Sequence, residues 1–141
     1  MTAPTDTAAR IVFERWHQTI LARDLDGLMA LYAEDAILET PLILVTLPGR
    51  TTGILTGKPD IHAFFEAGLK RIGKGLGRWW RTGIHFVNGH QLVWEYPRAT
   101  PDGDQTDLVE VMDLAGGLIA HHRVYWGWVG FKALSAAANG E

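Results

Sequence analysis

The residues best suited to chemistry lie in a predicted strand near the end of the chain. The segment LIAHHRVYWGW, residues 118–128, contains two adjacent histidines, His121 and His122. Neighbouring side chains on a strand point to opposite faces of the sheet, so only one of these imidazoles can face the interior. If Val124 and Trp126 face inward, His122 does too, and His121 belongs to the outer face with Arg123 and Tyr125.

A carboxylate for the inward histidine comes from the preceding predicted strand, DLVEVMDL. Glu110 shares a face with Leu108 and Met112, and a three-residue turn at AGG would place Glu110 directly opposite His122. We expect a buried hydrogen bond between these two side chains. Such a pair should titrate as a unit, so His122 could act as a general base or acid, with Glu110 orienting it. The alternative is that the pair only satisfies two buried polar groups and fixes the hairpin register.

Aromatic side chains are expected around this pair. Strand alternation in QLVWEY puts Leu92, Trp94 and Tyr96 on one face, and Trp16 falls on the apolar face of a predicted helix. Aromatic residues in such positions either pack a core or line an apolar cavity. In a cavity, Tyr96 would be the best additional hydrogen-bond donor.

The elements that must position these residues are helices in the first half and strands in the second. Apolar spacing predicts an amphipathic helix from about residue 7 to 22, a second in ARDLDGLMALYAEDA with Leu28, Leu31 and Tyr32 buried, and a third in KPDIHAFFEAGLKRI. AILETP suits a first strand, and four strands follow the third helix, the last running to Phe131. This order predicts an α+β domain in which one curved antiparallel sheet wraps around about three helices.

The apolar segment at residues 42–57 is interrupted by Pro48 and Gly49, and it permits two interpretations. It forms either an ordinary strand pair or a flap that narrows the mouth of a pocket.

Length and composition predict a single soluble domain. The chain has 141 residues, of which 47% are hydrophobic, and a net charge of -3. We expect one domain over residues 1–141, with its core at about 8–131 and a flexible tail at 132–141. No basic stripe favours nucleic acid, no segment predicts a membrane span, and a cytoplasmic location is expected. The chain has no cysteine, which excludes disulfides and thiolate metal sites, and neither a metal nor a cofactor is expected.

Three segments carry a family resemblance: RWHQTILARDLDGLMALYAEDAILETP, then GKPDIHAFFEAGLK, then hairpins ending in LIAHHRVYWGW. With these segments the chain resembles the SnoaL-like and ketosteroid-isomerase-like branch of the nuclear transport factor 2 superfamily. The resemblance covers about residues 8–131. It implies a cone-shaped half-barrel enclosing a deep apolar pocket, and a homodimer formed through the outer sheet face. The superfamily contains isomerases, polyketide cyclases, dehydratases, epoxide hydrolases and binding modules, so this fold does not fix the function.

The catalytic positions of these relatives are only partly retained. The resemblance places Trp16 where the isomerases have a tyrosine, Thr40 where they have the proton-shuttling aspartate, and Glu110 where they have a protonated aspartate. Val124 stands where the cyclases and epoxide hydrolases have an aspartate. A ketosteroid isomerase mechanism is therefore disfavoured. The resemblance also matches Glu110 with a histidine of the epoxide hydrolases, so both families imply that Glu110 lies inside the pocket.

Further candidates follow from the same resemblance and from strand alternation. The expected ligand-binding positions are Trp16, Thr40, Phe65, Trp94, Tyr96, Met112, Val124 and Trp126. Some dehydratase relatives use a Tyr-Asp-His set, which would correspond to Tyr32, Asp35 and His85. Asp35 is expected at the surface end of the second helix, and His85 in the core or on the surface. The remaining histidines, His17, His62 and His90, are predicted to be helix-edge or turn residues.

The sequence thus favours a SnoaL-like protein that takes a small hydrophobic carbonyl or hydroxyl compound. If it is an enzyme, we expect isomerisation, cyclisation or dehydration by proton transfer at His122 and Glu110. The alternative is a binding or dimeric interaction module of the same fold without catalytic activity.

Overall fold

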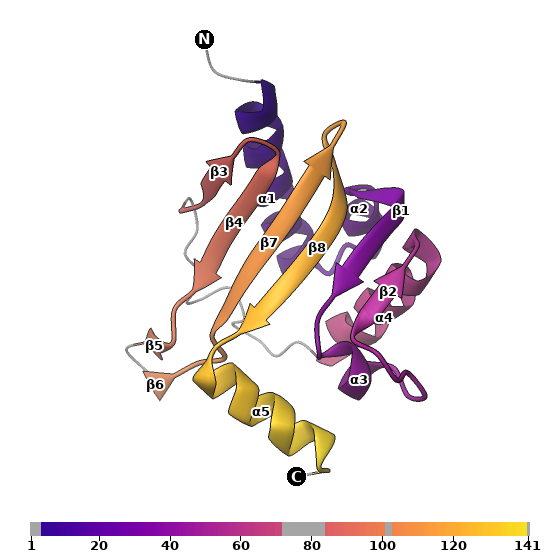
Figure 1. Ribbon diagram of the computed structural model, residues 1–141, viewed down its shortest axis with the longest axis vertical. Helices are drawn as coiled ribbons and strands as arrows, with labels where there is room; N and C mark the ends of the chain where they lie inside the picture. Colours follow the sequence, from indigo (N-terminus) through magenta and orange to yellow (C-terminus); the bar gives the residue numbers. More distant parts are fainter. Residues whose placement is uncertain (1–3, 72–83, 101–102, 141) are drawn as a thin grey trace.

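The computed structural model describes residues 4–71, 84–100 and 103–140. These residues form five helices and eight strands (Figure 1). In chain order they are α1 (Pro4–Ala22), α2 (Leu25–Met29), β1 (Tyr32–Glu39), α3 (Ile43–Thr46), β2 (Ile54–Thr56), α4 (Lys58–Arg71), β3 (Phe86–Asn88), β4 (Gln91–Tyr96), β5 (Ala99–Thr100), β6 (Gly103–Asp104), β7 (Leu108–Ala115), β8 (Leu118–Trp126) and α5 (Trp128–Ala138).

Six strands form one open sheet in the order β2-β1-β8-β7-β4-β3, and β5 and β6 form a separate pair. The strand β1 runs parallel to β8, whereas the other neighbours in the sheet are antiparallel. The sheet is therefore mixed, not wholly antiparallel as the order of helices and strands predicted. The parallel pair is possible because the long connection from β1 to β8 contains a helix and several strands.

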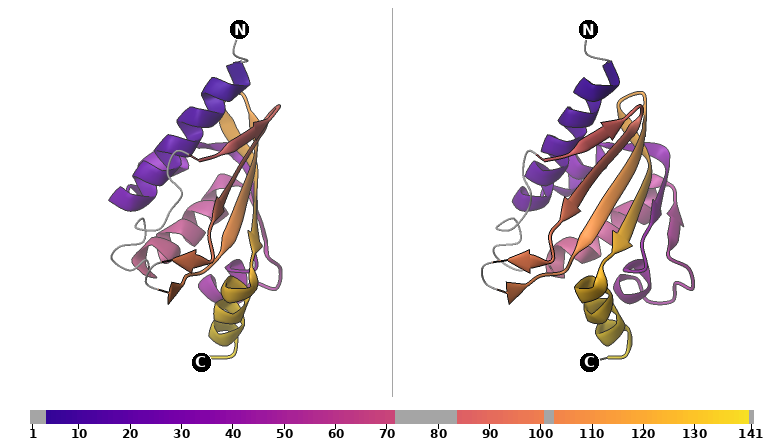
Figure 2. Two further views of the ribbon diagram at one scale, coloured as in Figure 1. Left: turned by 90° about the vertical axis from the view of Figure 1, so that its left-hand side faces the viewer. Right: turned by 60° about the vertical axis from the view of Figure 1, so that its left-hand side comes forward.

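Helices α1 and α4 lie on one side of the sheet, and Figure 2 shows the opposite face without a helix across it. Apolar side chains fill the layer between them, among them Val12 and Phe13 of α1, Ile61 of α4 and Leu92 of β4. Burial of this apolar surface is the main stabilising contribution of such a layer. The predicted α+β class is confirmed, and the core of the described residues lies between the helices and one face of the sheet.

The second predicted helix is shorter than expected and gives way to a strand. Asp24 caps α2 by accepting a hydrogen bond from the Gly27 amide at 3.0 Å, but the helix ends at Met29. The chain from Tyr32 onward pairs with β8, and Tyr32, Ala36 and Leu38 are buried. Pairing with a buried strand has overridden the helical tendency of this segment.

The segment at residues 42–57 combines a helical turn with a strand. Ile43–Thr46 forms α3, and β2 pairs antiparallel with β1. The strand-pair interpretation therefore holds for the second part of the segment only.

The C-terminal segment also differs from its prediction. β8 ends at Trp126, and Trp128–Ala138 is the helix α5, where a strand end and a flexible tail were expected. The Asp107 carboxylate accepts a hydrogen bond from the Gly130 amide at 2.7 Å, which satisfies one of the free amides in the first turn of α5. The alanine-rich sequence that follows favours a helix. None of the helices in the described part of the chain is long and apolar enough to cross a bilayer.

Candidate functional site

The hairpin between β7 and β8 decides which histidine faces the core. Its turn consists of Gly116 and Gly117, both with positive φ, and Ala115 pairs with Leu118. The register then shifts, because Leu114 pairs with Ile119 but Asp113 pairs with His121. The unpaired residue, Ala120, makes a β-bulge.

Because of this bulge, Ile119 and His122 lie on the same face although they are three residues apart. His122 is 2% exposed, and His121 on the outer face is only half-buried. The prediction that His122 points inward is confirmed.

Glu110 and His122 form the expected hydrogen bond, although not through the expected register. Glu110 is opposite Val124, and His122 is opposite Met112, because the turn has two residues and the strand has a bulge. The expectation of directly opposed residues is therefore wrong. The two side chains are diagonal neighbours instead, which is still within reach of long side chains. His122 Nε2 lies 2.8 Å from Glu110 Oε1, and Glu110 is 4% exposed.

The other imidazole nitrogen of His122 contacts a residue that the sequence had placed on a helix. The Tyr32 hydroxyl lies 2.9 Å from His122 Nδ1, and Trp16 Nε1 donates to the same hydroxyl at 3.3 Å. Tyr32 is fully buried, and burial raises the pKa of its phenol far above its ordinary value, so the hydroxyl keeps its proton. The sequence placed Tyr32 in the buried stripe of a helix; its burial is confirmed, although the residue begins the strand β1.

A second buried histidine lies close to the pair. His17 Nδ1 donates to the Phe13 carbonyl at 2.8 Å, and the Tyr96 hydroxyl lies 3.4 Å from His17 Nε2. Burial lowers the pKa of His17, which keeps this imidazole neutral near pH 7. The prediction of a helix-edge residue is wrong, because His17 continues the apolar stripe of Phe13, Trp16 and Ile20.

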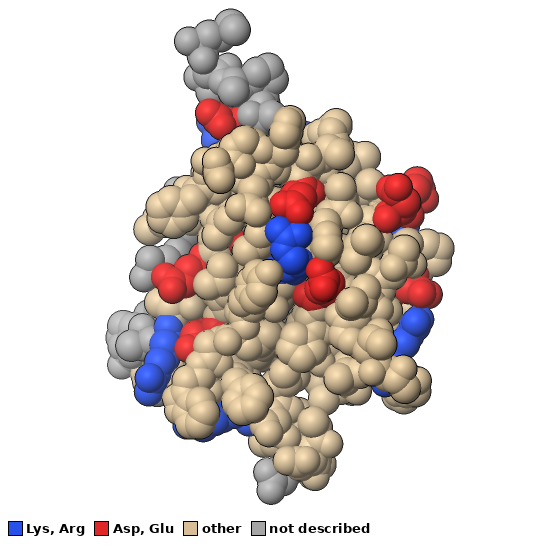
Figure 3. All heavy atoms as spheres, in the orientation of Figure 1, with Lys and Arg blue, Asp and Glu red and all other residues tan. Residues whose placement is uncertain are grey.

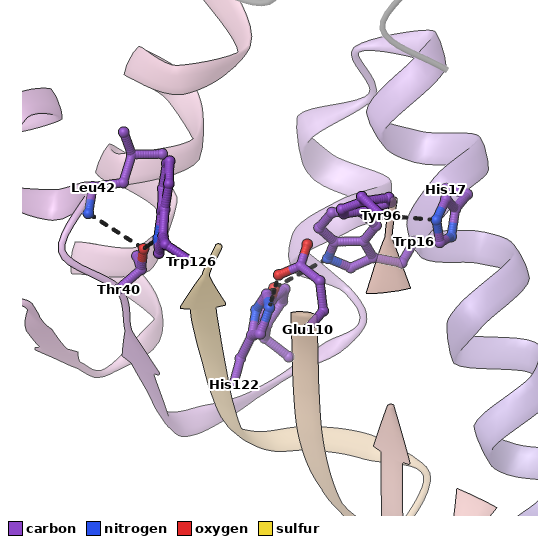
Figure 4. Close-up of polar contacts among 9 residues, drawn as sticks. Trp16, His17, Thr40, Leu42, Tyr96, Glu110, His122 and Trp126 are labelled. Atoms are coloured by element: carbon purple, nitrogen blue, oxygen red, sulfur yellow. Dashed lines mark hydrogen bonds and ion pairs between the residues drawn. The ribbon is translucent and has the colours of Figure 1, made fainter. Parts of the chain in front are cut away.

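Tyr96 connects this second histidine with Glu110. Burial, and then the charge of the Glu110 carboxylate, raise the pKa of Tyr96 well above its ordinary value. Tyr96 is also a diagonal neighbour of Glu110 on the inner face, because Trp94 pairs with Glu110 and Tyr96 pairs with Leu108. In Figure 4, Glu110 and His122 point toward each other, with Tyr96 and His17 on one side of them and Thr40 and Trp126 on the other.

Aromatic rings enclose the polar groups. Trp94 contacts Trp16 with ring centroids 5.4 Å apart, and Phe65 contacts Tyr32 at 5.7 Å. The indole N–H of Trp94 is buried and has no hydrogen-bond acceptor among the described residues.

The remaining predicted ligand-binding residues lie in two places. Met112 is fully buried opposite His122. Trp126 Nε1 donates to Thr40 Oγ1 at 3.1 Å, at a distance from the Glu110–His122 pair in Figure 4. Thr40 and Val124 also line an open hollow of about 380 Å³ beside the ends of β1 and β8.

The Tyr-Asp-His set suggested by the dehydratases is not assembled. Asp35 is exposed, as predicted, but it lies on β1 and not at a helix end. His85 stacks on Phe13 with ring centroids 4.6 Å apart, and its buried Nδ1 has no hydrogen-bond partner in the described residues. Only Tyr32 of this set touches the Glu110–His122 pair.

Solved structures share this fold at low sequence identity. A SnoaL-like protein of unknown function from Burkholderia thailandensis superposes with a TM-score of 0.65 at 18% identity, covering 86% of this chain and 96% of its own. A candidate ketosteroid isomerase from Kribbella flavida gives 0.62 at 18% identity, with 86% and 79% coverage. A candidate polyketide cyclase from Sinorhizobium meliloti gives 0.56 at 15% identity, with 81% and 93% coverage. No curated protein matches the chain.

These structures establish a common fold but not a common reaction, because folds of this kind host many activities. The sequence profile described as "SnoaL-like domain" matches residues 13–122, which is more than half of the chain. The chain therefore belongs to the SnoaL-like domain family.

Proposed function

We propose that this protein is an acid–base enzyme that moves a proton on a small hydrophobic carbonyl or hydroxyl compound. The observation that carries the proposal is the buried hydrogen bond of 2.8 Å between His122 Nε2 and Glu110 Oε1, surrounded by aromatic rings. Titratable groups held together in an apolar environment are enriched at sites of proton transfer. Such groups contribute to catalysis when they are positioned against the reacting atom.

The chemistry would be proton abstraction next to a carbonyl group. The C–H bond breaks, its proton passes to the Glu110–His122 pair, and its electron pair moves to the carbonyl oxygen as an enolate. The Tyr96 phenol, which keeps its proton because its pKa is raised, can donate a hydrogen bond to that oxygen. Return of the proton to a different carbon gives an isomer, and loss of hydroxide from the β-carbon gives a dehydrated product.

Deuterium exchange tests this proposal without knowledge of the natural substrate. We would measure the incorporation of deuterium at the α-carbon of 1-tetralone, a hydrophobic ketone, by ¹H NMR in D₂O. The protein should accelerate exchange over buffer, and Glu110→Gln should lower the protein-dependent rate about 10²- to 10⁴-fold. His121→Gln, on the outer face of the same strand, is the matched control and should keep the wild-type rate. Equal rates for Glu110→Gln and wild type would contradict the proposal.

A second candidate is a ligand-binding module without activity. It is favoured by Trp16, Thr40 and Val124, which stand where the resemblance places catalytic groups in related enzymes. Saturable binding of the fluorescent phenol 2-naphthol, together with exchange of 1-tetralone no faster than in buffer, would support this alternative.

We also propose that the protein forms a homodimer through the outer sheet face. Phe86 and Tyr125, which are 64% and 56% exposed, give this face large exposed aromatic side chains. Exposed aromatic residues are typical of interfaces. Tyr125→Glu should lower the molar mass measured by light scattering from that of a dimer to that of a monomer. A wild-type protein that is monomeric at high concentration would contradict the proposal.

A further inference from the structure

Both ring nitrogens of His122 are engaged within the protein, which limits what this residue can do. Nε2 faces Glu110 Oε1 at 2.8 Å, and Nδ1 faces the Tyr32 hydroxyl at 2.9 Å. His122 is 2% exposed. A ligand therefore has no free nitrogen of this imidazole to contact.

The contacts of Tyr32 decide where the proton of His122 lies. The Tyr32 oxygen already accepts the N–H of Trp16, because an indole nitrogen can only donate. The single hydroxyl proton of Tyr32 then has one acceptor among the described residues, His122 Nδ1. If Nδ1 carried a proton, the buried hydroxyl proton would have no acceptor, which is unfavourable. His122 is therefore held as the neutral tautomer with its proton on Nε2.

Glu110 consequently accepts the Nε2 proton on Oε1, so the contact with His122 occupies one of its two carboxylate oxygens. Tyr96 is a diagonal neighbour of Glu110 on the inner face, because Glu110 pairs with Trp94 and Leu108 pairs with Tyr96. The Tyr96 hydroxyl also approaches His17 Nε2 at 3.4 Å, and this nitrogen is an acceptor because the His17 proton on Nδ1 is donated to the Phe13 carbonyl. The hydrogen bonds from Tyr32 to His122 and from His122 to Glu110 thus approach the carboxylate from one side. A ligand could exchange a proton with Glu110 from the other side, where Tyr96 lies.

We infer that Glu110 is the group that exchanges the proton with the ligand, and that Tyr32 and His122 are positioning residues that hold its carboxylate. This inference refines the proposed acid–base function and rests on it. It reverses the roles expected from the sequence, in which His122 was the base and Glu110 oriented it. In the transfer step, the proton leaves the α-carbon of the ligand for Glu110 Oε2, and the electron pair of the broken bond moves to the ligand carbonyl.

The tautomer of His122 gives a test that does not depend on any substrate. Nitrogen-15 NMR of histidine-labelled wild-type protein should show a protonated, pyrrole-like Nε2 and an unprotonated, pyridine-like Nδ1 for His122. His17 should show the opposite tautomer. Tyr32→Phe should remove the preference and let Nδ1 carry a proton, whereas the exposed control Tyr125→Phe should leave the spectrum of His122 unchanged. A protonated Nδ1 in the wild-type protein would overturn the inference.

Two substitutions then separate the roles of Glu110 and His122 in the exchange of 1-tetralone. In His122→Gln, an amide N–H can replace the Nε2 donor but cannot transfer a proton, so the rate should fall no more than about tenfold. In Glu110→Gln, the rate should fall about 10²- to 10⁴-fold. A His122→Gln protein that is folded by circular dichroism but as inactive as Glu110→Gln would overturn the inference. If His122→Gln does not fold, Tyr32→Phe replaces it, with the same limit of about tenfold.

The failure of the proposed function would look different. Exchange by the wild-type protein at the rate of buffer would refute the acid–base function, and with it the catalytic role of Glu110. The ¹⁵N spectra would still show whether Tyr32 holds His122 in the stated tautomer.

Discussion

The two faces of the sheet carry the same pair of residue types in different surroundings. On the outer face, His121 bonds to Glu39, and the two side chains are 31% and 36% exposed. On the inner face, His122 bonds to Glu110, and the corresponding values are 2% and 5%. Water can replace a lost partner on the outer face but not on the inner face. The same chemical pair is therefore expected to contribute little in one place and to be indispensable in the other.

The hydrogen-bond networks around the His121–Glu39 and His122–Glu110 pairs also differ in their exposure. On the outer face, Arg123 donates two hydrogen bonds to the Asp113 carboxylate, at 2.6 and 3.1 Å. Figure 3 shows that charged side chains occupy only a small part of this face. On the inner face, a chain of hydrogen bonds is donated in one direction, from the Trp16 N–H through Tyr32 and His122 to Glu110. Within one protomer, the outer network consists of partly exposed charges, while the inner network fixes the positions of individual protons.

Removal of each histidine gives the largest expected contrast. His122→Ala removes the donor to Glu110 Oε1 and the acceptor of the Tyr32 hydroxyl proton, and it creates a cavity. It should therefore lower the free energy of unfolding by about 3–5 kcal/mol. His121→Ala should lower it by about 1 kcal/mol or less. Urea unfolding followed by circular dichroism measures both. Similar losses for the two variants would show that burial does not distinguish the pairs.

Removal of one hydroxyl on each face gives a smaller contrast. Tyr32→Phe removes the hydroxyl that accepts from Trp16 Nε1 and donates to His122 Nδ1 in the core, and it should lower the free energy of unfolding by about 1–3 kcal/mol. Tyr125→Phe on the outer face should change it by no more than about 0.5 kcal/mol. The same urea measurement applies, and a neutral Tyr32→Phe would mean that the inner chain does not require this hydroxyl.

Mild acid should affect the inner face first. The pKa of His17 is lowered below its ordinary value of 6.5 by burial, so the unfolded chain binds a proton more readily than the folded protein. The contribution of His17 to stability is thus present above pH 6.5 and is lost as the pH falls below it. Urea midpoints between pH 7.5 and about 5.5 should fall in the wild type and fall less in His17→Asn. The exposed His90→Asn is the control and should keep the wild-type slope.

Stronger acid should be needed to affect the outer face, and the effect should be the smallest. The hydrogen bond from Arg123 lowers the pKa of Asp113 below its ordinary value of 3.8. Its contribution is therefore present above that pH and is lost as the pH falls through the lowered pKa. Because the Asp113 side chain is 41% exposed, this contribution should stay below about 1 kcal/mol. Asp113→Asn should reduce the slope of stability against pH below 4 and leave the slope near pH 6 unchanged.

Strand alternation predicted the inner face correctly where the pattern was regular. Leu92, Trp94 and Tyr96 are all buried on β4, and Leu108 and Glu110 share a face of β7. The pattern could not distinguish a short helix from a strand in the segment that contains Tyr32, because helical and strand spacings overlap over a few residues. It also missed His17, although this residue lies on the apolar stripe of α1.

The sequence by itself determined the α+β class, the inward direction of His122 and the presence of a carboxylate beside it. Only the tertiary structure decided the register of β7 against β8, because a two-residue turn and a bulge at Ala120 replace the expected three-residue turn. It also brought Tyr32, ninety residues away in the sequence, against His122. The physical reason is that local spacing determines which face a side chain occupies, whereas its hydrogen-bond partners depend on which distant strands pair and in what register.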